Sequence, residues 1–195
     1  DVLMQTLASR GVAVPGAASR SGGDVLDQFV PLFCNAITRE YHAQRFLEYL
    51  LLPLSPLPAA LRYALAREFA RRPGRGGERW NAIIGKHTAA DDDAAARVRC
   101  FLPRPDELVE RQAIPCAWFR EAMSAYRLWL NGLAHAADRE SLRDAAGAAM
   151  ARVQHLCAAL ALHPSEHCAA DDIINLWQQL SAGERGATCR EAGSV

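Results

Sequence analysis

Lysine is almost absent from this chain of 195 residues, because Lys86 is the one lysine among 22 basic residues. Net charge is absent as well, since 22 acidic residues balance the 22 basic ones. A neutral chain has no overall field that attracts nucleic acid or a membrane surface. Any such binding must therefore come from a local cluster of charge.

The chain also lacks the signals of secretion and membrane insertion. It has no N-x-S/T acceptor and no basic start followed by an apolar run. The longest apolar stretch, "YLLLPLSPLPAALRYALA" at 49–66, contains three prolines and Arg62, so we expect no membrane span. The first residue is Asp1 and "GAASRSGG" at 16–23 has a flexible composition, so we expect a piece cut from a longer protein.

Catalytic motifs are missing too. The sequence has no G-x-S-x-G and no phosphate-binding loop of the Walker type, and "DDD" at 91–93 fits a solvated helix start. A cysteine nucleophile with a histidine base stays open in principle, because such pairs meet in space rather than in sequence, but nothing selects one pair. We predict that the chain is not an enzyme and needs no cofactor.

Six widely spaced cysteines are present, and we interpret them as reduced thiols of a cytosolic or nuclear protein. The best metal candidates are His155, Cys157, His163, His167 and Cys168. Zinc needs four converging ligands, whereas Pro164 is expected to break the helix between these groups and no C-x-x-C pair is present. We therefore predict no metal site.

Helical periodicity covers most of the chain and predicts an all-α fold, an irregular bundle of about seven to nine helices without a substantial sheet. We expect one helical domain over 1–195, with 16–23 and 187–195 flexible. The expected helices are 1–10, a helix from Asp24 to Leu52 that is broken or kinked near Pro31, 58–72, 78–86, 93–100, one opening at Pro105, and three in the C-terminal half.

The C-terminal half has the clearest pattern. Apolar residues from Phe119 to Leu133 step by three and four, and those from Leu142 to Leu160 repeat this spacing with small side chains. The two helices should pack as an antiparallel pair. A last helix should begin near "HPSEH" and end at Gly183.

Several segments together resemble the C-terminal helical domain of the alphaherpesvirus tegument protein encoded by the twenty-first gene of the unique long region. They are "LSPLPAALRYALAREFARR" at 54–72, "LPRPDE" at 102–107, "FREAMSA" at 119–125 and "PSEHCAADDIINLWQQLSAGERG" at 164–186. "LSPL" and "PRPD" are the most specific words. Residues 126–160 match poorly, and the family continues with further helices where this chain ends soon after 186.

The resemblance implies a non-enzymatic adaptor of the virion tegument, found in host cytoplasm and nucleus. Its implied partners are other tegument or capsid proteins and host proteins, in virion assembly, transport and cell-to-cell spread. The phosphatase-recruiting motif of the family lies upstream of this domain and is not carried onto this chain. The family domain is also credited with affinity for nucleic acid.

One segment carries a local excess of positive charge. Between 62 and 86 seven bases face only Glu68 and Glu78, and "FARRPGRGGERW" at 69–80 joins four arginines to Trp80. We predict nonspecific nucleic-acid contacts there, with Arg75 and Arg79 in a loop free to meet phosphates and Trp80 more typical of a core residue than of a stacking platform. The candidate residues are Arg62, Arg67, Arg71, Arg72, Arg75, Arg79 and Lys86. Two alternatives stay open: a helical domain of a bacterial effector or secretion regulator, and a dedicated RNA or single-stranded DNA binder.

Overall fold

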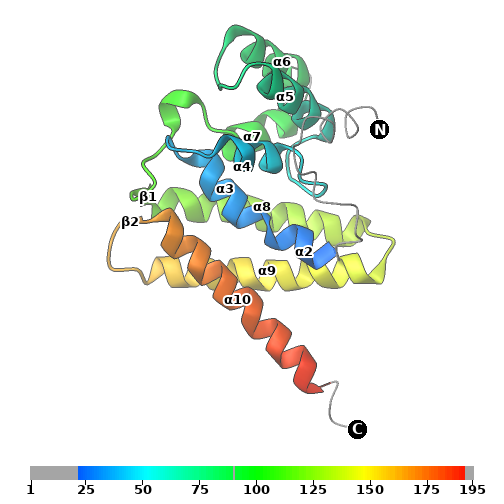
Figure 1. The fold of residues 1–195 in the computed structure, drawn as a ribbon. Helices are drawn as coiled ribbons and strands as arrows, with labels where there is room; N and C mark the ends of the chain where they lie inside the picture. Colours follow the sequence, from blue (N-terminus) through cyan, green and yellow to red (C-terminus); the bar gives the residue numbers. More distant parts are fainter. Residues whose placement is uncertain (1–21, 90, 192–195) are drawn as a thin grey trace.

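The computed structural model describes residues 22–89 and 91–191, and this part of the chain is predominantly helical (Figure 1). The all-α prediction is confirmed. The predicted helix at 1–10 lies outside the described residues. The described helices are α2 (Gly22–Asp27), α3 (Phe29–Ile37), α4 (Ala43–Leu50), α5 (Ala59–Arg71), α6 (Glu78–Thr88), α7 (Asp92–Phe101), the 3-10 turn η1 (Pro105–Glu107), α8 (Cys116–Ala136), α9 (Glu140–Ala161) and α10 (Ala170–Glu191).

The longest packed pair is α8 against α9, which run antiparallel across the molecule as predicted (Figure 1). Phe119, Met123, Tyr126 and Leu130 are buried on α8. The facing stripe of α9 is also buried and includes Ala146 and Ala149, whose small side chains let two helices approach closely. α2 packs on α9, and α10 packs on both α9 and α3.

Aromatic rings fill the space where α3 meets α8. The Phe29 ring stacks on Tyr126 with 3.9 Å between centroids, and Phe101 of α7 meets Phe29 edge-on at 5.8 Å. Tyr49 of α4 belongs to the same group and donates a hydrogen bond to the Phe101 carbonyl at 2.7 Å. This cluster joins the α8–α9 pair to the shorter helices α4–α7.

The break predicted near Pro31 lies at Gln28, with Pro31 itself inside α3, but the predicted continuation of this helix through 38–42 is wrong, because the chain breaks there a second time. Pro31 is the third residue of α3, where a backbone N–H has no partner inside the helix, so proline is tolerated. The helix predicted from Pro105 is also wrong. Only the single 3-10 turn η1 forms there. The Glu107 carboxylate closes this turn by accepting a hydrogen bond from the Arg104 backbone N–H at 2.8 Å.

The predicted end of the last helix at Gly183 is wrong as well, because α10 continues to Glu191. A glycine inside a helix lowers its stability by about 1 kcal/mol relative to alanine, but it ends a helix only where the backbone turns left-handed. In the described residues, positive φ occurs only at Gly74 and Gly76. The tail predicted at 187–195 is therefore helical up to 191, and 192–195 lie outside the described residues.

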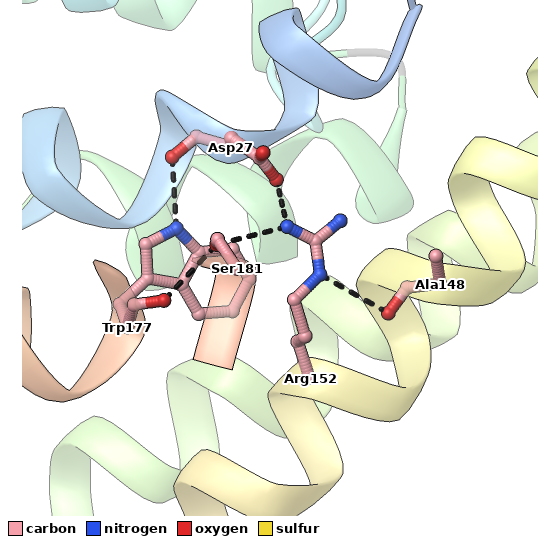
Figure 2. A network of polar contacts seen from close by, with 5 residues as sticks. All are labelled: Asp27, Ala148, Arg152, Trp177 and Ser181. Carbon is pink, nitrogen blue, oxygen red and sulfur yellow. Dashed lines mark hydrogen bonds and ion pairs between the residues drawn. The ribbon is translucent and has the colours of Figure 1, made fainter. Parts of the chain in front are cut away.

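A buried polar network fastens α2, α9 and α10 together (Figure 2). The Arg152 guanidinium of α9 pairs with the Asp27 carboxylate of α2 and donates to the Ser181 hydroxyl of α10 at 3.0 Å. The Trp177 indole N–H donates to the Asp27 carbonyl at 2.8 Å, and the Arg152 guanidinium carbon lies 5.3 Å from the Trp177 ring centroid. Arg152 is a structural cation, because each of these contacts joins elements of the fold.

Candidate functional site

The predicted basic segment runs from α5 through the 72–77 turn into α6. These two helices pack on each other and form the end of the molecule opposite the free end of α10 (Figure 1). The structure divides the seven predicted basic residues into two groups. Arg62 and Arg75 are held inside the fold, whereas Arg67, Arg71, Arg72, Arg79 and Lys86 are exposed.

Arg62 is not available to a ligand. Its side chain is buried and donates hydrogen bonds to the carbonyls of Leu50, Leu52 and Leu57. These carbonyls lie at the end of α4 and in a connection with three prolines, which have no N–H to offer. Burial lowers the pKa of Arg62. Arg62 therefore satisfies backbone acceptors, and its assignment to nucleic-acid binding is wrong.

Arg75, predicted to be free, is also structural. Its guanidinium donates to the carbonyls of Ala36 and Thr38 at the C-terminal end of α3, the second at 3.2 Å. The guanidinium carbon lies 4.1 Å from the ring centroid of Tyr41 and 4.6 Å from that of Phe46. A cation at this position complements the negative end of the helix dipole and the ring faces. The prediction that Arg75 meets phosphates from a free loop is wrong.

Trp80 belongs to the core, as its residue type favoured. It is 4% exposed and its ring lies 6.0 Å from that of Phe46. The exposed ring of this region is instead Tyr63, which is 45% exposed. Tyr63, Arg67 and Arg71 follow one another at intervals of four residues and so lie along one face of α5.

The five remaining cations form what we call the basic face: Arg67, Arg71, Arg72, Arg79 and Lys86. None of them makes an ion pair or a side-chain hydrogen bond within the described part of the chain. Arg79 and Lys86 are seven residues apart on α6, about two helical turns, so they lie along one side of that helix. Glu68 and Glu78 are the acids of the segment, so five positive charges stand against two negative ones. Guanidinium groups exposed in this way are suited to phosphate oxygens.

A second cluster lies at the start of α8. Cys116, His163 and Cys168 place one ligand atom each within 4.8 Å of one another. The Sγ atoms of Cys116 and Cys168 are 2.9 Å apart, and both cysteines are buried. Burial, and then the Cys116 thiol, raise the pKa of Cys168 to about 12.

A small antiparallel sheet creates this second cluster. β1 (Ile114–Pro115) pairs with β2 (His167–Cys168), and Ile114 lies opposite Cys168. The Cys116 N–H donates to the Glu166 carbonyl at 2.8 Å, which holds the start of α8 against the α9–α10 connection. Beside it opens a surface pocket of about 520 Å³, whose lining includes Cys116, His163, Glu166 and His167.

The structure keeps part of the metal-candidate set and separates the rest. α9 ends at Ala161, before Pro164. The chain after it brings His163 close to Cys168. His155 and Cys157 remain on α9 outside the cluster. Cys116, which the sequence analysis left out, takes their place. The sequence offers little indication of this role for Cys116, because it is 52 residues from Cys168 and only the β1–β2 pairing brings the two together.

Comparison with known protein families, with curated proteins and with solved structures finds no match to this chain. Fold and surface together define an all-α protein with an exposed basic face and a separate cysteine–histidine cluster. In the described residues, no helix combines the length and the apolar character needed to cross a bilayer.

Proposed function

We propose that this chain is a non-enzymatic helical interaction domain whose basic face contacts nucleic acid without sequence preference. The observation that carries the proposal is that five exposed cations lack partners in the described chain and share the α5–α6 surface with an exposed tyrosine. Cations without internal partners are free to exchange their counterions for phosphates.

The expected mode is contact with the nucleic-acid backbone rather than reading of bases. Arginine binds phosphate oxygens through paired N–H groups, and such contacts carry no sequence information by themselves. The Tyr63 ring would add stacking with an unpaired base, which tolerates any base because each has a π face. A single strand of RNA or DNA therefore fits this surface better than a duplex.

The proposed setting is the alphaherpesvirus tegument. Its support is the family resemblance stated above, in which "LSPL" and "PRPD" fall on residues that build the fold. Ser55 accepts from the Leu57 N–H at 3.3 Å, and Arg104 caps η1. On that resemblance we propose an adaptor with tegument, capsid and host proteins as partners in host cytoplasm and nucleus. Detection of the chain in virions after detergent removes the envelope tests this setting, and its absence from the tegument fraction contradicts it.

The nucleic-acid proposal is tested by salt dependence. We expect the triple variant Arg67→Ala, Arg71→Ala and Arg79→Ala to bind single-stranded RNA more weakly than the wild type. Each lost phosphate contact should flatten the slope of log affinity against log salt by roughly 0.7, so the triple variant should lose about 2. Fluorescence anisotropy across a salt series measures the slope.

A charge-matched control separates the basic face from overall charge. Arg127 on α8, Arg139 in the α8–α9 connection and Arg143 on α9 are exposed, away from the basic face. Their triple alanine variant removes the same charge and should leave the slope unchanged. Equal loss in both variants, or no wild-type binding at low salt, contradicts a nucleic-acid role for the basic face.

A further inference from the structure

We propose that Cys116, Cys168 and His163 bind one Zn²⁺ ion, at a site independent of the basic face. The observation is the convergence of two thiols and one imidazole from the start of α8 and from the α9–α10 connection, with their ligand atoms within 4.8 Å of one another. Zinc favours this combination of sulfur and nitrogen ligands, at about 2.3 Å from sulfur and 2.0 Å from nitrogen. Ligands around one tetrahedral ion then lie less than 4 Å apart, so small shifts of the side chains are sufficient.

The backbone already brings the ligands together. Cys116 is the first residue of α8 and Cys168 the last of β2, and the β1–β2 pairing aligns the two segments. His163 comes just after α9, in the connection that leads back to β2. A metal bound here would tie the start of α8 to the end of α9 and to the segment that begins α10.

His163 has a backbone partner of the kind that orients a metal ligand. Its Nδ1 lies 3.2 Å from the Ser165 carbonyl and also 3.2 Å from the Ser165 N–H. When Nδ1 carries the proton and donates to the carbonyl, Nε2 has a free lone pair for a metal. Metal-bound histidines commonly make such a second hydrogen bond.

Access and the fourth ligand position come from the neighbouring pocket. Cys116 and His163 both line it, so an ion can arrive from solvent although both cysteines are buried. Three protein ligands leave one tetrahedral position, which faces this pocket and would hold a water molecule. Binding displaces the two thiol protons to the buffer and transfers no electrons.

The test uses the whole chain, purified with reductant and without chelator. We expect one zinc per chain by elemental analysis, and a melting temperature that rises with Zn²⁺ and falls with a chelator. Replacement by Co²⁺ should give a near-ultraviolet charge-transfer band from thiolate together with the visible bands of a tetrahedral site.

Matched variants identify the ligands. His163→Ala changes an exposed residue, so the fold should persist, yet zinc affinity should fall by at least the roughly 10-fold to 100-fold lost when an outer partner of a ligand is removed. His167→Ala removes a histidine of the same pocket outside the cluster and should leave affinity unchanged. Cys116→Ser and Cys168→Ser should abolish the cobalt charge-transfer band, whereas Cys157→Ser should keep it.

Three results overturn the proposal. One is a reduced, folded chain that retains no zinc and shows no shift in melting temperature with Zn²⁺. Another is a mass spectrum in which Cys116 and Cys168 are joined by a disulfide in the freshly purified protein. The third is zinc binding that survives His163→Ala and both serine substitutions, because the ion would then be bound elsewhere.

Discussion

At the scale of single residues, arginine performs two different tasks in this protein. Arg62, Arg75 and Arg152 are drawn into the fold by carbonyls, a carboxylate and ring faces. The five cations of the basic face remain in water. The neighbouring element decides between the tasks: Arg62 and Arg75 reach carbonyls at or just after the C-terminal end of another helix, where backbone acceptors have no partner inside the helix, and Arg152 reaches the Asp27 carboxylate.

This difference predicts a large loss of stability when Arg75 is replaced and a small one when Arg79 is replaced. Arg75→Ala should lower the free energy of unfolding by about 2 kcal/mol, because charged hydrogen bonds are lost and the carbonyls of Ala36 and Thr38 lose their donor. Arg79→Ala, at an exposed position, should change it by less than about 0.5 kcal/mol. Urea unfolding measures both. If Arg75→Ala left the free energy of unfolding unchanged and weakened RNA binding, Arg75 would have to be counted among the nucleic-acid contacts.

At the scale of elements, the turn between α5 and α6 depends on one glycine. Gly76 has a φ of 83°, and a side chain there would collide with the Pro105 ring. The turn therefore links the basic face to the "PRPD" segment through a close contact that glycine alone permits. Gly85 differs, because a Cβ added there meets open space.

Alanine substitutions should thus have opposite signs at these two glycines. Gly76→Ala should destabilise the protein by about 1–3 kcal/mol, through backbone strain and contact with the proline ring. Gly85→Ala should stabilise it by roughly 0.5–1 kcal/mol, because alanine is the better residue inside a helix. Thermal melts of the two variants are the measurement, and a stable Gly76→Ala protein would show that the turn adapts.

At the scale of the whole molecule, the Arg152 network connects parts of the chain that lie far apart in sequence. Asp27 and Arg152 are separated by 125 residues, and Asp27 and Trp177 by 150. Such contacts add stability only after the α8–α9 pair and α10 have come together. The network therefore joins the two ends of the described chain into one packed body (Figure 2).

Removing one partner of this network should weaken the whole fold. Asp27→Ala should lower the free energy of unfolding by about 3–5 kcal/mol, because the buried Arg152 charge loses its carboxylate. Adding Arg152→Met should recover part of the loss, since the buried guanidinium is then removed as well. A double-mutant cycle by urea unfolding measures the coupling, and strictly additive effects would contradict it.

Local pattern was enough to predict the all-α class, the antiparallel α8–α9 pair and the burial of Trp80. Apolar spacing expresses how a helix presents its side chains, and that is a property of neighbouring residues. The charge excess of 62–86 was equally visible, but the sequence could not distinguish a cation that completes a helix end from one that remains in water. Arg62 and Arg75 are of a residue type that often binds phosphate, but their surroundings make them structural residues.

Only tertiary structure decided which residues meet. Cys116 and Cys168 are 52 residues apart, and no local spacing indicates that two-residue strands will bring them together. The break at 38–42 and the continuation of α10 through Gly183 were decided in the same way. In each case the local preference is worth about 1 kcal/mol or less, and packing against distant elements outweighs it.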